Sequence, residues 1–361
     1  MLSRVLGGVI APRARETDRR GQFPRAAIDA LGDAGILGCT VARSLGGGGL
    51  SLVDAADLVR RVARACASTA TVLQSHFTTV AVLERHGPRR LRAEIASGGH
   101  LASCAVLDDT RREDPLGTSS SARGCRGVVT IDGSKPWVSA AGEADSYLWS
   151  TGALTGAGTS LWLVPATAPG LHVPAGQETM GLRGSGAQAV TADPLTVPAE
   201  SLLGADGEGT RIIRSVVLPW YCVLGAAVSL GIMDSAIEAT TAAVAASRSH
   251  RPDLLAELAR VKLRADSVAL LCRDTVDAVA WEQEPTTPVL ALRALAVQSA
   301  VRVTDVAMKI SQASTARPAE VAIEASQDAE RRFRDARAAY AVPPTPDSVF
   351  EHVGAALVRD R

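Results

Sequence analysis

The chain has 361 residues, 47% of them hydrophobic and 21% charged, and its formal net charge is zero. That length allows two or three domains. The balanced charge gives no reason to expect nucleic acid or an anionic membrane as a partner. Only residues 215–232 approach the roughly 20 uncharged residues of a membrane span, and their proline and glycines favour a buried helix instead.

The six cysteines are scattered along the chain, with no CxxC pair and no histidine nearby at ligand spacing. This pattern predicts reduced, mostly buried side chains and no metal site. The short apolar start is followed at once by Arg13, Arg15 and Asp18, which argues against a signal peptide. We therefore expect a cytoplasmic protein.

Residues 1–99 show helical spacing of apolar side chains. Ser51 is placed to cap a helix that continues through Val59 and Val62. Residues 68–83 predict a buried helix that ends near His86. His76 and His86 are isolated, so we expect hydrogen-bonded core or helix-end residues rather than metal ligands.

Residues 100–209 change to a period of two. Short strands are expected at 102–107, 127–131, 146–150, 160–165, 171–173 and 189–197, separated by Gly, Pro and Asp turns. This arrangement predicts a small β-sandwich or β-barrel domain. The polar stretch 108–122 has no pattern and is expected to be a disordered loop or a lid.

The segment 128–141, VVTIDGSKPWVSAA, carries the most informative side chains. Asp132-Gly133 is typical of a two-residue hairpin turn. On the return strand, Trp137 and Ser139 are two residues apart and so share a face. An aromatic ring beside a hydroxyl suits a planar heterocycle, which could stack on the ring and be hydrogen-bonded at its edge. The alternative is a tryptophan that packs into an ordinary core.

Residues 210–361 return to helical spacing, with helices expected at 211–247, 253–283, 286–316, 320–340 and 346–358. Long helices with short connections predict a bundle. An apolar stripe that is wide for a single bundle is formed by Val297, Val301, Val303, Val306 and Ile310. We therefore expect a homo-oligomer, either a homodimer or a homotetramer.

Several motifs resemble the acyl-CoA dehydrogenase superfamily. They are the Trp137 segment, DALGDAGILGCTV with SLGGGGLSL, residues 181–209, and FRDAR at 333–337. The fold that the resemblance implies is α+β. It has an N-terminal α-helical domain (1–99), a middle β-sandwich or barrel domain (100–209) and a C-terminal helical bundle (210–361).

The resemblance implies that FAD takes a hydride from an acyl thioester while a glutamate removes the α proton. One form of the family carries this glutamate after the FRDAR-like segment, where this chain has Ala341. Another form carries it on the first bundle helix, at the position that corresponds to Tyr221. Neither residue is a carboxylate, so the catalytic residue stays unassigned. Tyr221, Tyr340, Asp347 and Glu351 are the candidates.

The flavin contacts that the resemblance implies are partly retained. Trp137 and Ser139 match the residues that stack on the ring and bond its edge. Leu107 begins the segment that replaces the family's Thr-Glu-Pro turn. What remains of the residues that hold the dinucleotide is at most one arginine, Arg248 or Arg251, together with Gln312. The missing glycines near Gln312 weaken the expected grip on FAD.

Three functions follow as hypotheses. The first is an FAD-dependent oxidoreductase that acts on an acyl thioester, carried by coenzyme A or an acyl carrier protein, with a different base or none. The second is a protein that has kept the fold and lost FAD, acting as a non-redox enzyme or a binding protein. The third is a flavin-dependent monooxygenase, which needs no base for an α proton. The departures from the family favour specialised, secondary metabolism over primary β-oxidation.

Overall fold

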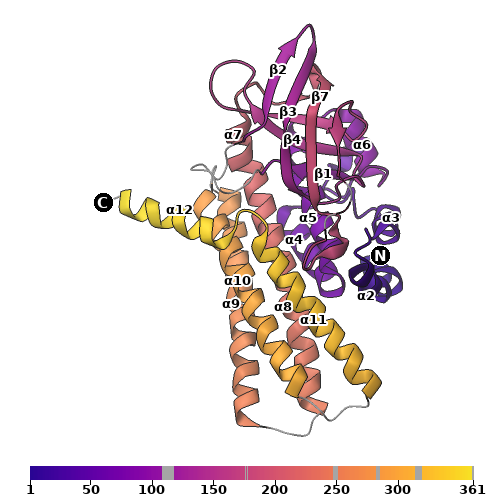
Figure 1. The fold of residues 1–361 in the computed structure, drawn as a ribbon, viewed down its shortest axis with the longest axis vertical. Helices are drawn as coiled ribbons and strands as arrows, with labels where there is room; N and C mark the ends of the chain where they lie inside the picture. The colour runs from indigo at the N-terminus through magenta and orange to yellow at the C-terminus, as the bar shows by residue number, and fades with distance from the viewer. Residues whose placement is uncertain are drawn as a thin grey trace.

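The computed structural model describes residues 1–107, 118–174, 176, 178–246, 251–281, 285–313 and 319–359. It has N-terminal helices, a middle part of two β-sheets and a C-terminal part of long helices, arranged as Figure 1 shows. The α+β class is therefore confirmed.

The N-terminal helices include one that is almost fully buried. They are α1 (Leu2–Val5), α2 (Ala11–Arg20), α3 (Arg25–Asp33), α4 (Leu52–Ala65), α5 (Ala67–His86) and α6 (Arg89–Ala96). Ser51 begins α4 with a capping box, because its hydroxyl accepts from the Asp54 N–H and the Asp54 carboxylate accepts from the Ser51 N–H. The predicted cap is thus confirmed. Most of α5 is buried, as its apolar sequence indicates.

The middle part consists of two four-stranded sheets. The strands are β1 (Ala102–Ala105), β2 (Ser121–Cys125), β3 (Val128–Val138), β4 (Ser146–Gly152), β5 (Thr159–Pro165), β6 (Leu171–His172), β7 (Gln188–Pro198) and β8 (Leu202–Leu203). One sheet has the order β1-β4-β5-β8 and the other β2-β3-β7-β6. The sequence did not predict β2 or β8. Most of the loop expected at 108–122 lies outside the described residues.

The predicted hairpin turn at Asp132-Gly133 is wrong. β3 continues through both residues, and its pairing with β7 shifts between Ile131 and Gly133, which marks a bulge. Gly133 has φ 149°, and a Cβ there would lie 2.4 Å from the Ser120 hydroxyl. The hairpin turn is instead Arg126-Gly127, where both residues have positive φ and connect β2 to β3. Trp137 therefore lies near the end of one long strand.

The C-terminal part is a bundle of long helices below the sheets (Figure 1). Its elements are α7 (Gly209–Ile212), α8 (Leu218–Ala246), α9 (Pro252–Trp281), α10 (Thr286–Ala313), α11 (Ala319–Ala341) and α12 (Pro346–Arg359). A π-helical segment, Ile213–Val217, joins α7 to α8. The last helix, α12, projects from the body of the molecule.

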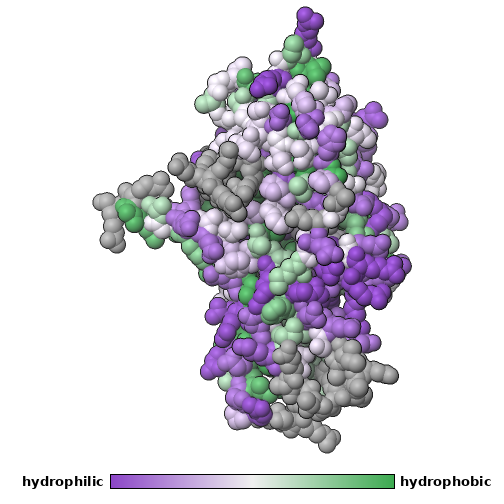
Figure 2. Space-filling model, viewed as in Figure 1, coloured by the Kyte–Doolittle hydropathy of each residue, from purple (hydrophilic) through white to green (hydrophobic). Residues whose placement is uncertain are grey.

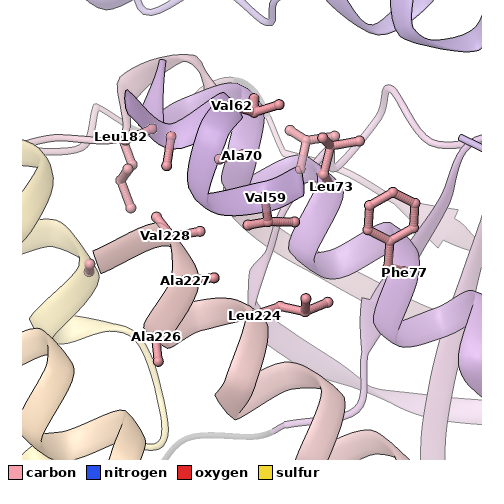
Figure 3. Close-up of a cluster of buried hydrophobic side chains, with 14 of the residues drawn as sticks. Val59, Val62, Ala70, Leu73, Phe77, Leu182, Leu224, Ala226, Ala227 and Val228 are labelled. Carbon is pink, nitrogen blue, oxygen red and sulfur yellow. The ribbon is translucent and has the colours of Figure 1, made fainter. Parts of the chain in front are cut away.

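The core joins the N-terminal helices to the bundle. Figure 3 shows Val59 of α4 and Leu73 of α5 opposite Leu224 and Ala227 of α8, and all four are essentially inaccessible to solvent. Residues 209–246 are long and apolar enough to cross a membrane, yet 89% of their most apolar stretch is buried inside the protein. The prediction of a buried helix here is confirmed.

The apolar stripe of α10 does not form a free surface. Val297, Val303, Val306 and Ile310 are buried within the bundle of the same chain. The stripe was the reason for expecting an oligomer, so that reason fails even though oligomeric state itself stays a prediction.

His76 is a hydrogen-bonded core histidine, as expected. Its Nε2 lies 2.9 Å from the Leu37 carbonyl and its Nδ1 lies 3.1 Å from the Ala102 N–H. This pairing requires the neutral ring with the proton on Nε2, because a protonated ring has no lone pair for Ala102. Burial lowers the pKa of His76 to about 4.

The free energy of unfolding should therefore fall in acid. In the unfolded chain a histidine titrates near pH 6.5. The unfolded state then binds more protons than the folded state between about pH 6.5 and 4, and stability is lost as pH falls through that range. A shift of this size corresponds to roughly 3 kcal/mol. Urea titrations at pH 7 and pH 4.5 measure the change.

The matched variant is His76→Gln, which has no titrating ring. Its stability at pH 7 should be lower than that of the wild type, and the gap should narrow at pH 4.5. Burial raises the pKa of Asp335 to about 6, so this carboxyl favours the folded state as pH falls. That contribution is the same in the wild type and the variant. A gap that is independent of pH would contradict the assignment.

Candidate functional site

A cavity of about 220 Å³ lies where the end of β3 and residues 178–187 face α5 and the bundle. It is lined by Thr71, Gln74, Trp137, Ser139, Glu178, Thr179, Met180, Gly181, Leu182, Ser185, Ala187, Tyr221, Val228, Arg293, Arg337, Ala338, Ala339, Ala341 and Val342. Trp137, Ser139, Tyr221 and Ala341, which the sequence analysis singled out, thus share one cavity.

The β wall of the cavity is the end of β3. Trp137 is 39% exposed, unusual for a large aromatic side chain, so its ring is available to a ligand rather than packed in a core. The strand end is fixed by backbone bonds, because the Ala140 N–H donates to the Ser185 carbonyl and the Ala141 N–H to the Gly186 carbonyl. Ala140 has a positive φ of 54°, a conformation rare for residues other than glycine and common at functional sites.

A second wall is the loop that contains Gly181 and Leu182. Leu182 has a positive φ of 53°, and its N–H donates to the Asp335 carboxylate of α11 at 2.7 Å. Gly181 lies directly against α11, since a Cβ there would be 2.2 Å from the Arg334 carbonyl. Glycine is therefore required for this loop to pack on the helix.

The bundle wall contains Ala341 and Tyr221, the two positions at which the resemblance predicts the catalytic glutamate, and neither carries a carboxylate. Ala341 ends α11 and Tyr221 lies on α8. Burial raises the pKa of the Tyr221 hydroxyl, so the hydroxyl stays protonated at neutral pH and can donate a hydrogen bond but cannot act as a base.

The cavity also contains Arg293 of α10, which is only 3% exposed. Its Nη2 donates to the carbonyls of Ala339 and Val342 at 2.9 and 3.3 Å, at the C-terminal end of α11. No sequence pattern predicted Arg293, Glu178 or Gln74 as a residue of the site. Arg293 stands alone in an apolar stretch, so no local signal marked it.

The remaining sequence candidates lie elsewhere. Tyr340 does not line the cavity, and its hydroxyl is 3.2 Å from the Asp347 carboxylate. Asp347 and Glu351 are exposed and do not line it either. Leu107 follows β1 and is also outside the lining. Arg248 and the side chain of Gln312 lie outside the described residues.

No cluster of three metal-ligating side chains occurs among the residues that the structure describes. All six cysteines are free thiols, and Cys125 is the one that is exposed.

The N-terminal 98 residues match the family model of the acyl-CoA dehydrogenase N-terminal domain. The chain is 24% identical over 342 residues to the short-chain specific acyl-CoA dehydrogenase of Bos taurus, which covers 90% of this chain and 81% of that one. The human enzyme is 26% identical over 235 residues, 63% of this chain and 57% of its own length. An amino sugar nitrososynthase, RubN8 of Streptomyces rubradiris, is 34% identical over 216 residues, 56% of this chain and 50% of its own.

Solved structures share the fold over nearly the whole chain. Butyryl-CoA dehydrogenase from Megasphaera elsdenii superimposes with a TM-score of 0.86 at 20% identity, covering 99% of this chain and 96% of that one. KijD3 in complex with FMN and a dTDP-linked amino keto sugar superimposes with a TM-score of 0.80 at 22% identity, covering 100% of this chain and 92% of that one.

Proposed function

Because the chain belongs to the acyl-CoA dehydrogenase superfamily, we propose that it is a flavin-dependent oxidoreductase that acts on an acyl thioester carried by coenzyme A or an acyl carrier protein. The observation that carries this proposal is the cavity shared by Trp137, Ser139, Tyr221 and Ala341. The cavity best fits a flavin on the β wall and an acyl group on the bundle wall.

The residues of the β wall suit a flavin ring. Trp137 offers an exposed aromatic surface for stacking, and the hydroxyl of the partly buried Ser139 has no hydrogen-bond partner among the described residues. A bound flavin would supply hydride transfer, or oxygen activation when reduced. We favour FAD, in keeping with the family, and Arg248 and Gln312 are our candidates to hold its dinucleotide part.

The proton chemistry must differ from that of the family. Among the described lining residues, Glu178 carries the single carboxylate. It is exposed at the cavity and is our candidate base for a substrate that must lose a proton. Specialised bacterial metabolism is the setting that such a departure favours.

The first experiment is a visible absorption spectrum of the purified protein. We expect bound flavin, and bleaching of its absorption when a suitable acyl thioester is added without oxygen. A colourless protein that does not take up added FAD or FMN would contradict the proposal and would favour a non-redox enzyme or binding protein on this fold.

A flavin-dependent monooxygenase is the second candidate. The lack of a carboxylate at Ala341 and Tyr221 favours it, since such chemistry needs no base for an α proton. The similarity to the nitrososynthase points the same way. Substrate-dependent oxygen uptake that requires a supply of reduced flavin, with no bleaching by thioesters, would identify this function.

Replacing Trp137 with Ala should loosen flavin binding. The loss is expected to be about 1 kcal/mol for a stacked aromatic pair, together with the apolar area that the ring buries. Fluorescence titration of the apoprotein with FAD measures it. Trp137→Phe retains a stacking ring and is the control. Unchanged cofactor affinity and activity in Trp137→Ala would show that this tryptophan is only structural.

We still propose a homodimer or homotetramer, but its interface would use surfaces other than the apolar stripe of α10. Leu263 and Leu270 of α9 are 66% and 61% exposed, and Leu357 of α12 is 67% exposed. Helix α12 projects from the body of the molecule (Figures 1 and 2). Leu263 and Leu270 are seven positions apart and so lie on one face of α9, and exposed apolar side chains that gather on one face are typical of a contact surface. Light scattering should give an oligomer, and Leu263→Glu with Leu270→Glu should reduce its mass. A wild-type monomer that is stable to dilution would contradict this.

We also propose a cytoplasmic location. Free thiols at all six cysteines, five of them buried, are typical of a reducing compartment.

A further inference from the structure

Arg293 is a buried cation with only part of its bonding capacity used. Its Nη2 donates to the carbonyl of Ala339 in the last turn of α11 and to the carbonyl of Val342 directly after that helix. Carbonyls at the C-terminal end of a helix carry partial negative charge and stabilise the cation at Nη2. Nε is buried without a hydrogen-bond partner, and no described residue accepts from Nη1.

No described carboxylate forms an ion pair with Arg293. Arg337 lines the same cavity and differs in this respect, because its Nη2 lies 2.6 Å from the Asp305 carboxylate. Glu178 is exposed and also makes no ion pair with Arg293. An unpaired buried charge is costly, and burial lowers the pKa of Arg293. An arginine nevertheless keeps its proton in proteins, so the cavity contains a positive charge without an acid of the protein beside it.

Tyr221 is the neighbouring donor. Tyr221 and Arg293 line the same cavity, and the Tyr221 hydroxyl has no hydrogen-bond partner among the described residues. α8 permits this arrangement at Gly225, where a Cβ would lie 3.1 Å from Nη1 of Arg293 and 2.8 Å from Nε2 of Gln74. The guanidinium and the phenol together present donors to one cavity.

The geometry points to an anion subsite in which Arg293 and Tyr221 bind a carboxylate on the acyl part of the substrate. This inference rests on the proposed function and specifies its substrate class as mono-thioesters of dicarboxylic acids. Arginine suits a carboxylate because its planar N–H groups match the two oxygens. In the family the protein carries the acidic side chain on this wall. Here residue 341 is an alanine, and the carboxylate belongs to the substrate instead.

The test compares two thioesters of equal chain length. Succinyl-CoA and butyryl-CoA differ by a terminal carboxylate in place of a methyl group. Their dissociation constants are measured by calorimetry on the purified protein with its flavin content recorded. We expect succinyl-CoA to bind at least tenfold more tightly, and added salt to change this ratio little because the subsite is buried.

Three variants assign the preference. Arg293→Met should abolish the difference between the two dissociation constants, and Arg293→Lys, which keeps a cation, should retain part of it. Tyr221→Phe should weaken succinyl-CoA binding selectively. Arg337→Met is the matched control from the same cavity, and its effect on the two thioesters should be equal. Circular dichroism checks that each variant is folded. If Arg293→Met does not fold, the two single variants Tyr221→Phe and Arg293→Lys test the anion subsite in its place.

The outcomes separate this inference from the function on which it rests. A wild-type flavoprotein that binds both thioesters equally would overturn the subsite alone, as would an Arg293 variant that weakens both alike. A protein with no flavin and no affinity for either thioester would overturn both proposals.

Discussion

Turnover of butyryl-CoA or octanoyl-CoA by the purified protein with an artificial electron acceptor is expected to be negligible, and Ala341→Glu is expected to raise it. Ala341 ends α11 and lines the cavity, and the resemblance predicts a glutamate at this position. Tyr221 cannot replace that base, because burial raises the pKa of its hydroxyl. A positioned general base contributes about 10²–10⁴-fold in rate, so the gain in kcat should fall within or below that range.

The control for this gain is a change that adds the same length without a base. Ala341→Gln should leave the rate at the wild-type level. Glu178→Gln tests the alternative source of any residual wild-type activity, since Glu178 is the carboxylate among the described lining residues. Robust wild-type turnover that survives Glu178→Gln would contradict our interpretation of the bundle wall. It would point to a base outside the lining, such as Asp347 or Glu351.

Gly181→Ala should destabilise the protein by roughly 1–3 kcal/mol, the usual cost of forcing an extra methyl group into a packed position. The new Cβ would lie 2.2 Å from the Arg334 carbonyl and 2.5 Å from the Asp335 N. These are backbone atoms of α11 and cannot rotate away, so the loop must move from the helix. The hydrogen bond from the Leu182 N–H to Asp335 would be lost with it.

Denaturant unfolding measures the loss, and flavin affinity shows whether the cavity wall has moved. Gly8→Ala is the control, because nothing lies within 4 Å of a Cβ at that position. Gly8 is helical, so alanine there should be neutral or stabilise by up to about 1 kcal/mol. Equal stability of Gly181→Ala and the wild type would mean that the loop and α11 are not in firm contact.

The sequence by itself determined the class of fold and much of its outline. Helical periodicity predicted the long C-terminal helices, because a helix that packs on one side repeats its apolar residues every three or four positions. The Ser51 cap was predictable because it depends on a hydrogen bond between residues only three positions apart in the chain. Trp137 and Ser139 were predicted to share a face, and both line the cavity, even though the hairpin proposed before them is a bulge.

That error shows where local chemistry stops being decisive. Asp-Gly suits a two-residue turn and also a bulge within a strand, since both exploit the freedom of glycine. The pairing of β3 with β7 and the approach of Ser120 to Gly133 select the bulge. The true turn contains Arg126, which has a positive φ of 49° that its residue type does not favour.

Only the tertiary structure decided the composition of the cavity. Leu182 and Asp335 are 153 positions apart, and the hydrogen bond between them positions the loop on α11. Arg293 lies within an apolar helix and becomes a candidate binding group only because α11 ends beside it and no acid accompanies it. Local sequence determines the periodicity of each element, whereas the neighbours of a buried charge depend on how distant elements pack. The sequence therefore identified the β wall of the site, and the folded chain alone revealed the cation opposite it.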